Sequence, residues 1–298
     1  MDNLNKDFAR FVLLAVVALS TVVALPAQAA HPHRHRVTAA ADPDHISLLS
    51  STALVIDQTN QQVLYSKNPD PIHPIASITK LMTALVVLNS KQDLNEELVV
   101  TNEDVDSLRN TSSHLRVGAH ASRTDFLRMA LIASENRAAA ALGRNYPGGI
   151  AAFVAQMNVE AQQLGMTNSH FEDSSGLHGG NVSTAQDLAI LVQVAFQQPL
   201  IRDITTTATV SVPVGLRGHA VTFHNTNPLV AQSNWDIGLS KTGFINESGQ
   251  CLVMQATITG HPMVIVLLDS RGHHARIGDA NRVRQWLEAR SRLTVSQL

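Results

Sequence analysis

The pattern of hydrophobic and polar residues changes its period along this chain. Two short β-prone runs, 53–56 and 62–65, flank the turn-forming tetrapeptide 57–60 and predict a strand hairpin. Residues 78–88 are then apolar on nearly every side, which predicts a buried helix. Helical patterns are also found at 124–133, 137–143, 149–164 and 188–196. Gly165 is expected to end the third of these, and Ser183 with Gln186 predicts a capping box before the fourth.

Beyond Pro199 the pattern favours strands. Five short β-rich segments follow, at 209–214, 220–223, 235–240, 251–259 and 262–268. Gly260-His261 is expected to join the last two as a tight hairpin. Residues 275–290 predict a final helix.

This order predicts an α/β protein with layered helices and sheet. Strands from both chain ends should form one mainly antiparallel sheet, because a sheet with helices against it is the economical way to bury both ends. Residues from roughly 77 to 200 would form a helical lobe inserted in the sheet lobe, with a cleft between the two.

The first residues of the 298-residue chain have the features of an export signal. Lys6 and Arg10 precede the apolar run 11–25, and Ala27-Gln28-Ala29 is a small-x-small cleavage site. The run is shorter than the roughly 20 residues that span a bilayer. We expect a signal peptide over residues 1–29, a periplasmic location, and no membrane span after cleavage.

Residues 30–48 are expected to be a flexible linker, followed by one domain over 49–298. The alternating His31, His33 and His35 could bind a metal ion, but a solvated tail is favoured because no acidic or Cys partner accompanies them. The net charge of −2 gives no case for nucleic-acid binding. Cys251 is the only cysteine and lies in an apolar run, which predicts a buried hydrophobic residue rather than a nucleophile.

Three short motifs suggest chemistry: Ser77-Ile78-Thr79-Lys80, Ser134-Glu135-Asn136 and Lys241-Thr242-Gly243. This ordered set, with a related middle motif, is characteristic of penicillin-binding proteins and class A β-lactamases. In a helix, residues three apart share a face, so Lys80 would lie within reach of the Ser77 hydroxyl. A serine needs a base, and a lysine becomes one when burial and a second cation, here Lys241, lower its pKa.

The other motif residues are expected to complete the site. The N–H groups of Ser77 and Phe244 would stabilise an oxyanion, and Gly243 would let a substrate backbone lie along the edge strand. Thr242 and Lys241 would meet a substrate carboxylate. Ser134 would relay a proton to the leaving amine, and Asn136 would bind the substrate amide and hold Lys80.

Residues 50–290 resemble the low-molecular-mass penicillin-binding proteins, the D-alanyl-D-alanine peptidase family. The similarity is carried by three segments, 63–68, 76–83 and 174–177, together with the three motifs. Residues 134–140, 146–149 and 241–244 are most similar to the endopeptidase members. The resemblance implies a β-lactamase/transpeptidase-like fold and a periplasmic serine enzyme that cleaves peptidoglycan cross-links through an acyl-enzyme on Ser77. It also implies covalent inhibition by β-lactams and no cofactor or metal.

The sequence departs from the family's pattern in one respect and leaves a second feature open. The all-β second domain that carboxypeptidase relatives often have is expected to be absent, because the last predicted helix lies close to the end of the sequence. Relatives also place an arginine near the final strand to meet the substrate carboxylate; Arg276 is the candidate here and Arg271 competes with it.

Three alternative functions remain. A D-alanyl-D-alanine carboxypeptidase would use the same motifs, and the sequence does not separate it from an endopeptidase. A class A β-lactamase would carry an E-x-x-L-N loop, but residues 170–177 lack it. A non-catalytic peptidoglycan-binding protein would have lost the nucleophile or base, whereas Ser77 and Lys80 are both present.

Overall fold

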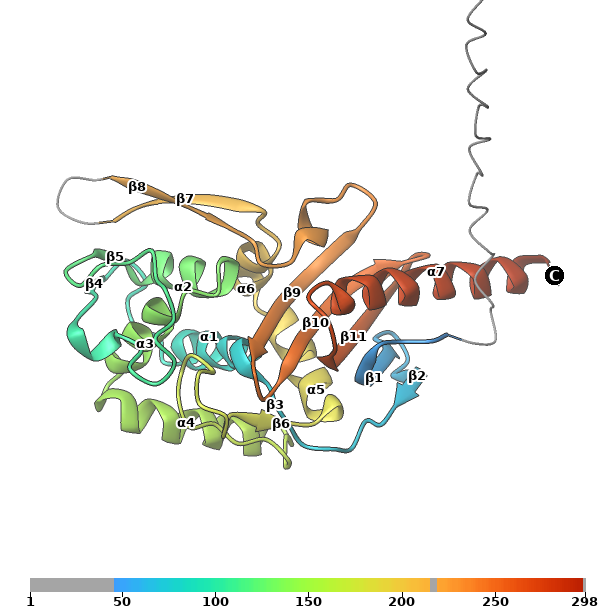
Figure 1. The fold of residues 1–298 in the computed structure, drawn as a ribbon, viewed down its shortest axis with the longest axis horizontal. Coiled ribbons are helices and arrows are strands. Elements are labelled where there is room, and N and C mark those ends of the chain that lie inside the picture. The colour runs from blue at the N-terminus through green and yellow to red at the C-terminus, as the bar shows by residue number, and fades with distance from the viewer. Residues whose placement is uncertain (1–45, 215–218, 297–298) are drawn as a thin grey trace, which may run out of the picture. The chain divides into compact units, whose positions relative to one another are not determined.

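The computed structural model describes residues 46–214 and 219–296, which form the fold shown in Figure 1. A five-stranded antiparallel sheet has the order β2-β1-β11-β10-β9. Its strands are β1 (Ser50–Asp57), β2 (Gln62–Lys67), β9 (Asp236–Ile245), β10 (Gly249–Ile258) and β11 (His261–Ser270). The first strand pairs with the last, with Val55 opposite Ile265. The predicted union of both chain ends in one antiparallel sheet is therefore confirmed.

Helices cover both faces of this sheet, because its side chains alternate between two hydrophobic clusters. Helix α7 (Ala275–Ser296) packs on β10 and β11, where its Trp286 lies in the same cluster as Val55. Helix α5 (Ala185–Phe196) packs on β1, β10 and β11 within the other cluster, which contains Leu54. The strands are thus buried on both sides.

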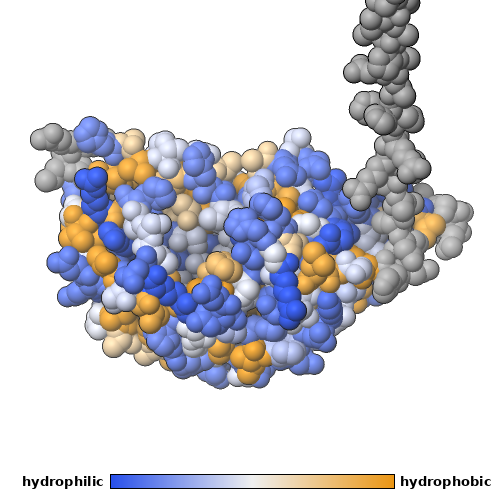
Figure 2. Space-filling model, viewed as in Figure 1, coloured by the Kyte–Doolittle hydropathy of each residue, from blue (hydrophilic) through white to orange (hydrophobic). Residues whose placement is uncertain are grey.

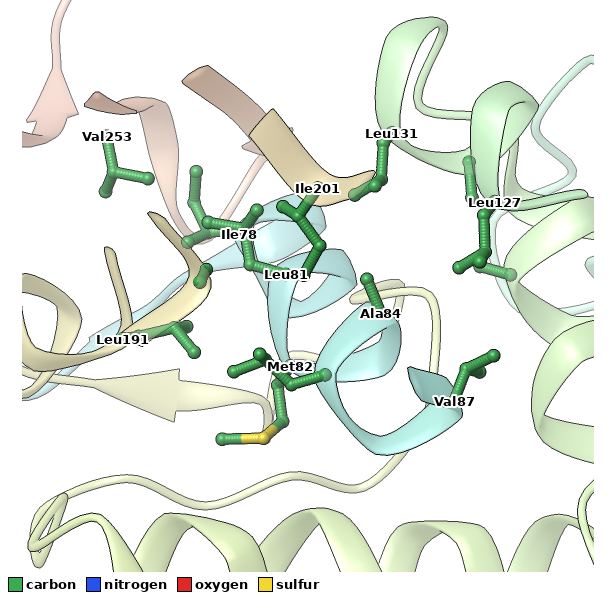
Figure 3. Packing of buried hydrophobic residues seen from close by; sticks show 14 of the residues in the cluster. Ile78, Leu81, Met82, Ala84, Val87, Leu127, Leu131, Leu191, Ile201 and Val253 are labelled. Atoms are coloured by element: carbon green, nitrogen blue, oxygen red, sulfur yellow. The ribbon is translucent and has the colours of Figure 1, made fainter. Parts of the chain in front are cut away.

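The buried helix α1 (Thr79–Asn89) occupies the centre of the helical lobe. It contacts α2 (Arg123–Ile132), α3 (Asn136–Arg144) and α4 (Gly149–Gln163) as well as α5. Figure 3 shows Ile78, just before α1, on the side of Val253 of the sheet, and residues of α1 such as Ala84 and Val87 directed toward the surrounding helices. The 3-10 turn Ala76–Ile78 leads directly into α1 and also contacts β9. The sheet and the helical lobe therefore meet at the start of α1.

Shorter elements complete the chain. Three small antiparallel pairs lie apart from the main sheet: β3 (His73–Pro74) with β6 (Val182–Ser183), β4 (Glu97–Val99) with β5 (His120–Ser122), and β7 (Thr209–Pro213) with β8 (Ala220–His224). The chain also forms the 3-10 turns Asn102–Asp104 and Pro228–Ala231 and the helix α6 (Pro199–Thr205). The predicted strands at 209–214 and 220–223 exist, but they form their own hairpin.

Four details of the sequence-based prediction are wrong. The chain forms α6 after Pro199 before any strand begins, since Pro199 occupies the first helical turn. The cap of α5 is Thr184, whose side chain accepts from the Asp187 N–H, and Ser183 instead belongs to β6. Residues Thr259 and Gly260, both with positive φ, form the β10–β11 turn rather than Gly260-His261. Strand β9 extends to Ile245 instead of ending near residue 240.

The two ends of the described chain add further detail. Ile46 and Leu48 are already buried in the cluster beneath α7, so packing begins before residue 49. Among the described residues, no helix has the length and apolar character needed to cross a membrane. The face drawn in Figure 2 is mainly hydrophilic, with hydrophobic residues in small groups. The predicted signal peptide and the three alternating histidines lie outside the described residues.

Candidate active site

Ser77 lies in the 3-10 turn before α1, where two glycines allow other segments to approach it closely. Ala76 has a positive φ of 48°, an uncommon conformation that turns the chain into the helix. A Cβ on Gly176 would lie 1.9 Å from the Ala76 carbonyl oxygen. A Cβ on Gly243 would lie 2.7 Å from the Ile75 carbonyl oxygen and 3.2 Å from the Ser77 nitrogen. The Ser77 turn therefore packs closely between the loop that contains Gly176 and strand β9, which contains Gly243.

Lys80 is fully buried one turn after Ser77 and uses all its donors. Its Nζ donates to Ser77 Oγ at 2.8 Å, to Asn136 Oδ1 at 2.8 Å and to the Ser175 carbonyl oxygen at 2.6 Å. The predicted contacts of Lys80 with Ser77 and Asn136 are present, whereas Ser175 was not foreseen. The amine is thus aimed at the serine hydroxyl from a fixed position.

Burial lowers the pKa of Lys80 to about 7, although the negative charges of Asp173 and Glu135 act in the opposite direction. The sequence predicts that the charge of Lys241 contributes to this lowering of the pKa. In the structure, burial is the principal cause, and repulsion between the two lysines acts on Lys241 instead. A neutral Lys80 can accept the Ser77 proton near neutral pH.

Lys241 extends from β9 into the same buried region. Its Nζ donates to Ser134 Oγ and to the Thr242 carbonyl oxygen, both at 2.9 Å. Burial, followed by the charges of Lys80 and Arg276, lowers the pKa of Lys241 well below its usual value. Because β9 continues to Ile245, the K-T-G motif lies within the edge strand rather than at its end.

Ser134 and Glu135 of the S-x-N motif link α2 to α3, as predicted, and Asn136 is the first residue of α3. Ser134 has a positive φ of 60°, a strained backbone state that is often found at functional sites. Two residues later, the Asn136 amide nitrogen donates to Thr111 Oγ1 at 3.1 Å. This contact ties the motif to the loop before β5. Thr111 carried no sequence signal, because it belongs to a segment without a periodic pattern.

One half of the cleft carries hydroxyl groups and a cation. This pocket of about 250 Å³ is lined by Ser77, Ser134, Asn136, Thr226, Thr242, Gly243, Phe244 and Arg276. Thr242 Oγ1 donates to Thr226 Oγ1 at 2.6 Å, and Arg276 Nη1 donates to the Gly243 carbonyl oxygen at 2.8 Å. Arg276 therefore reaches the cleft, whereas Arg271 lines a different pocket beside Asp269. Sequence reasoning missed Thr226, which follows β8 in an irregular segment.

The other half of the cleft continues along the edge strand. A second pocket of about 250 Å³ is lined by Ser77, Arg109, Thr111, Asn136, Gly176, Leu177, Phe244, Ile245 and Asn246. Both pockets share Ser77, Asn136 and Phe244, a residue that is 54% exposed. All nine predicted site residues therefore line this cleft or hydrogen-bond at its floor. An extended peptide could pair with β9 past the serine hydroxyl.

Cys251 lies beneath the site without taking part in it. The residue is fully buried, and burial raises the pKa of its thiol to about 11. A thiol in that state is a poor nucleophile, so the prediction of a buried hydrophobic residue is confirmed. Within the described part of the chain, no group of three or more His, Cys, Asp or Glu side chains is arranged to hold a metal ion.

Comparison with known proteins identifies the family. Residues 36–272 match the peptidase family S11, described as D-alanyl-D-alanine carboxypeptidase. A D-alanyl-D-alanine endopeptidase of Pseudomonas aeruginosa is 45% identical over 94% of this chain and 88% of its own length. A D-alanyl-D-alanine endopeptidase of Escherichia coli K12 is 41% identical over 92% of this chain and 88% of its own.

The fold is similar to that of a solved penicillin-binding protein. Penicillin-binding protein D2 from Listeria monocytogenes, solved in a cefotaxime-bound form, superposes with a TM-score of 0.71 at 28% identity, covering 82% of this chain and 98% of that one. The match over most of the sequence and the high identity to the two endopeptidases agree with the three motifs that meet in the cleft. The chain therefore belongs to the D-alanyl-D-alanine carboxypeptidase family of peptidases, S11.

Proposed function

We propose that this protein is a serine D-alanyl-D-alanine endopeptidase that hydrolyses peptidoglycan cross-links. The observation that carries the proposal is the contact of 2.8 Å between Lys80 Nζ and Ser77 Oγ, made by a buried amine whose pKa is lowered to about 7. Nucleophile and base therefore lie within direct proton-transfer distance, in states suited to neutral pH.

In the first half of the reaction, neutral Lys80 takes the Ser77 proton as Oγ attacks the D-alanyl carbonyl carbon. The oxyanion forms between the N–H groups of Ser77 and Phe244, which come from the helix start and the edge strand. When the intermediate collapses, the carbon–nitrogen bond breaks. Ser134 passes its proton to the leaving nitrogen and accepts a replacement from Lys241, 2.9 Å away. An ester on Ser77 remains.

In the second half, Lys80 has released the Ser77 proton to solvent and Lys241 has regained one. Water then attacks this ester with Lys80 again as base, and Lys80 passes the proton from the water to Ser77 Oγ as the ester bond breaks, which restores the hydroxyl. Asn136 holds Lys80 in place and is suited to bind the substrate amide. The paired hydroxyls of Thr242 and Thr226, with Arg276 beside them, suit the carboxylate next to the scissile amide. Gly243 lets the substrate backbone approach β9 closely.

The choice of endopeptidase over carboxypeptidase rests on similarity. The two curated relatives described above are named endopeptidases, whereas the family as a whole is described as carboxypeptidase. Both activities would use the same buried machinery. They differ in whether the leaving group is a single D-alanine or a whole cross-linked stem peptide.

We also propose a domain organisation, a cellular location and a mode of inhibition for this protein. Residues 1–29 would be a signal peptide that directs the enzyme to the periplasm, followed by a linker from residue 30 and by one peptidase domain, whose packing starts at Ile46 and Leu48 rather than at residue 49. Penicillins would acylate Ser77, because they present a strained amide to the same nucleophile. The cefotaxime-bound relative with this fold supports that expectation.

Digestion of purified cross-linked peptidoglycan tests the activity. An endopeptidase converts dimeric muropeptides to monomers, whereas a carboxypeptidase removes only terminal D-alanine. Ser77→Ala should abolish cleavage and labelling by fluorescent penicillin while the far-UV circular dichroism stays unchanged. Cleavage that persists in the variant would show that another residue is the nucleophile. Rapid hydrolysis of a chromogenic cephalosporin would instead indicate a β-lactamase.

A further inference from the structure

The loop that supplies a hydrogen-bond acceptor to Lys80 is folded around one carboxylate. Asp173 Oδ1 accepts from the backbone N–H groups of Ser175 and Gly176, both at 2.5 Å, and from the Ser175 hydroxyl at 2.8 Å. Asp173 Oδ2 accepts from the His178 N–H at 2.7 Å. One side chain thus binds four donors of this loop, so the shape of the loop depends on it.

Two successive peptide groups of this loop direct their carbonyl oxygens toward α1. The Ser174 carbonyl oxygen accepts from Thr83 Oγ1, and the Ser175 carbonyl oxygen accepts from Lys80 Nζ, each at 2.6 Å. Thr83 and Lys80 are three residues apart, so they share a face of the helix. A trans peptide group directs its C=O and its N–H to opposite sides. The N–H groups of the same two peptides therefore point away from α1, where both donate to Asp173.

The peptide group between Ser175 and Gly176 links Asp173 to the general base. Its C=O accepts from Lys80, and its N–H donates to Asp173. Hydrogen bonds in such a chain polarise one another, and a bond to a carboxylate is stronger than one between neutral groups. The carbonyl oxygen is therefore a better acceptor for the amine. Rotation of this peptide group would break both bonds at once, so Asp173 fixes the direction from which Lys80 is held.

Other contacts attach the loop to its surroundings on either side of Asp173. Ser174 Oγ donates to the Ala139 carbonyl oxygen at 2.8 Å, which joins the loop to α3. Asn181 Oδ1 accepts from the N–H groups of Glu172 and Asp173, at 2.5 and 3.2 Å. These contacts place the ends of the loop, whereas the N–H groups behind the acceptor of the base are bound by Asp173.

Charged groups reach Lys80 from three elements. Burial lowers the pKa of Lys80, and the charge of Asp173, followed by that of Glu135 at the start of α3, opposes this effect. Lys241 faces Lys80 from β9, and burial followed by the charge of Lys80 lowers the pKa of Lys241. Asp173 is thus the carboxylate with the larger effect on the charge of the base.

Asp173 lies behind the catalytic cleft rather than in it. It lines a separate pocket of about 170 Å³, whose other charged residues are Glu103, Asp104 and Arg144. Arg144 Nη2 lies 2.9 Å from Asp104 Oδ2, so these two charges are paired with each other. A substitution at Asp173 therefore leaves the residues that line the cleft unchanged, and its effect on the reaction must pass through the loop.

We propose that Asp173 is a positioning residue for the general base and acts on Lys80 through the peptide group of Ser175 and Gly176. This inference rests on the proposed function, because it takes Lys80 as the acceptor of the Ser77 proton. Removal of the carboxylate should weaken the alignment of the amine. It should also let the amine lose its proton at lower pH, since a nearby negative charge favours the ammonium form.

Asp173→Asn tests this role while the shape of the side chain is preserved. The measurement is the second-order rate constant for acylation by a fluorescent penicillin, followed from pH 5 to pH 9. Its plateau should fall on the order of tenfold, as expected for a lost charge-assisted hydrogen bond. Its acidic limb should shift toward lower pH by about half a unit or more. A limb that stays where it is in the parent would overturn the proposal.

Asp173→Glu separates the charge from the hydrogen bonds. It keeps a carboxylate near Lys80 but lengthens the side chain, so the plateau should fall while the acidic limb stays close to that of the parent. A plateau equal to that of the parent would refute the positioning role, also in the case that Asp173→Asn does not fold.

Two further variants serve as controls. Glu172→Gln removes the neighbouring carboxylate, which pairs with His178, and should leave both the plateau and the limb unchanged. Ser174→Ala removes the bond to Ala139 and should lower the melting temperature without moving the limb. If Ser174→Ala moves the limb as far as Asp173→Asn does, the shift comes from a loosened loop, and the proposal is refuted.

Cleavage of cross-linked peptidoglycan by the parent protein reports separately on the proposed function. If the parent cleaves cross-links and the limb of Asp173→Asn does not move, only the positioning role is lost. If penicillin does not acylate the parent, the proposed function is refuted, and the positioning role with it.

Discussion

Gly176 packs directly on the carbonyl group of Ala76, the residue before the reactive serine. Its φ of +83° and the 1.9 Å that would separate a Cβ from the Ala76 oxygen leave no room for a side chain. The neighbouring Ser175 carbonyl oxygen accepts from Lys80. This contact therefore sets the position of both the Ser77 turn and one hydrogen-bond acceptor of the base.

Gly176→Ala is expected to damage both stability and activity. The positive φ alone costs on the order of 1–3 kcal/mol for an alanine, before the clash is counted. The melting temperature and the rate of penicillin acylation should both fall. Gly179→Ala is the matched control, since its Cβ would have open space around it. Equal melting temperatures and acylation rates in the two variants would contradict the close packing of Gly176 on Ala76.

Removing the buried amine should slow acylation without unfolding the protein. In Lys80→Met the general base is lost, so we expect the acylation rate constant to fall by about 10²- to 10⁴-fold. Stopped-flow measurement with a fluorescent penicillin provides that rate. Lys91→Met, an exposed substitution of the same type, should acylate like the parent. A Lys80 variant that retains most of the rate would assign the base role elsewhere.

The acylation rate should rise with pH through about 7. Only neutral Lys80 accepts the serine proton, and the pKa of Lys80 is lowered to about 7. The acidic limb of a profile of kcat/KM against pH therefore reports this group in the free enzyme. A rate that is flat between pH 5 and pH 9 would argue against a lysine base.

The lowered pKa of Lys80 also predicts how the stability of the protein changes with pH. Unfolded Lys80 keeps its proton up to its ordinary pKa, whereas the folded group loses it near 7, so the unfolded state binds more protons between these values. The free energy of unfolding should therefore rise with pH above about 7 because of Lys80. Urea titrations at pH 6 and pH 9 would measure this, and the rise should be smaller in Lys80→Met.

Two arginines near the last strand should differ in their effect. Arg276 lines the cleft, so Arg276→Gln should raise KM for carboxylate-bearing peptides by on the order of tenfold. Arg271 lines a different pocket, so Arg271→Gln should leave KM unchanged. Steady-state kinetics on one peptide substrate compares them. A larger effect at Arg271 would reverse the assignment.

Removal of the Thr226 hydroxyl should lower kcat/KM, because the hydroxyl is the hydrogen-bond acceptor of Thr242. Thr226 Oγ1 accepts from Thr242 at 2.6 Å, and Thr226→Val leaves that hydroxyl without its acceptor. We expect a loss of about 1 kcal/mol in transition-state binding, or roughly fivefold in kcat/KM. Thr222→Val on β8 is the control, because its hydroxyl only meets Ser211 on the surface.

Local patterns in the sequence were sufficient to predict most elements and the core of the site. Ser77 and Lys80 are three residues apart at a helix start, and helical geometry alone brings them together. The buried helix and the strands at both chain ends follow from runs of apolar residues, because burial depends on the side chains themselves. The motif residues were therefore found before any tertiary contact was known.

The tertiary structure alone decided the environment of those residues. The degree to which Lys80 is buried, and the acceptor provided by Ser175, depend on a loop almost a hundred positions away. Thr226 and Arg109 lie in irregular segments, where no period marks a residue as facing the cleft. Strand β9 extends beyond its apolar run because β10 offers backbone partners, and β7 and β8 pair only with each other. Sequence periodicity indicates which side chains of a segment can be buried. Only the packed chain determines which distant groups share a cleft, and how far burial in that cleft shifts the pKa of each group.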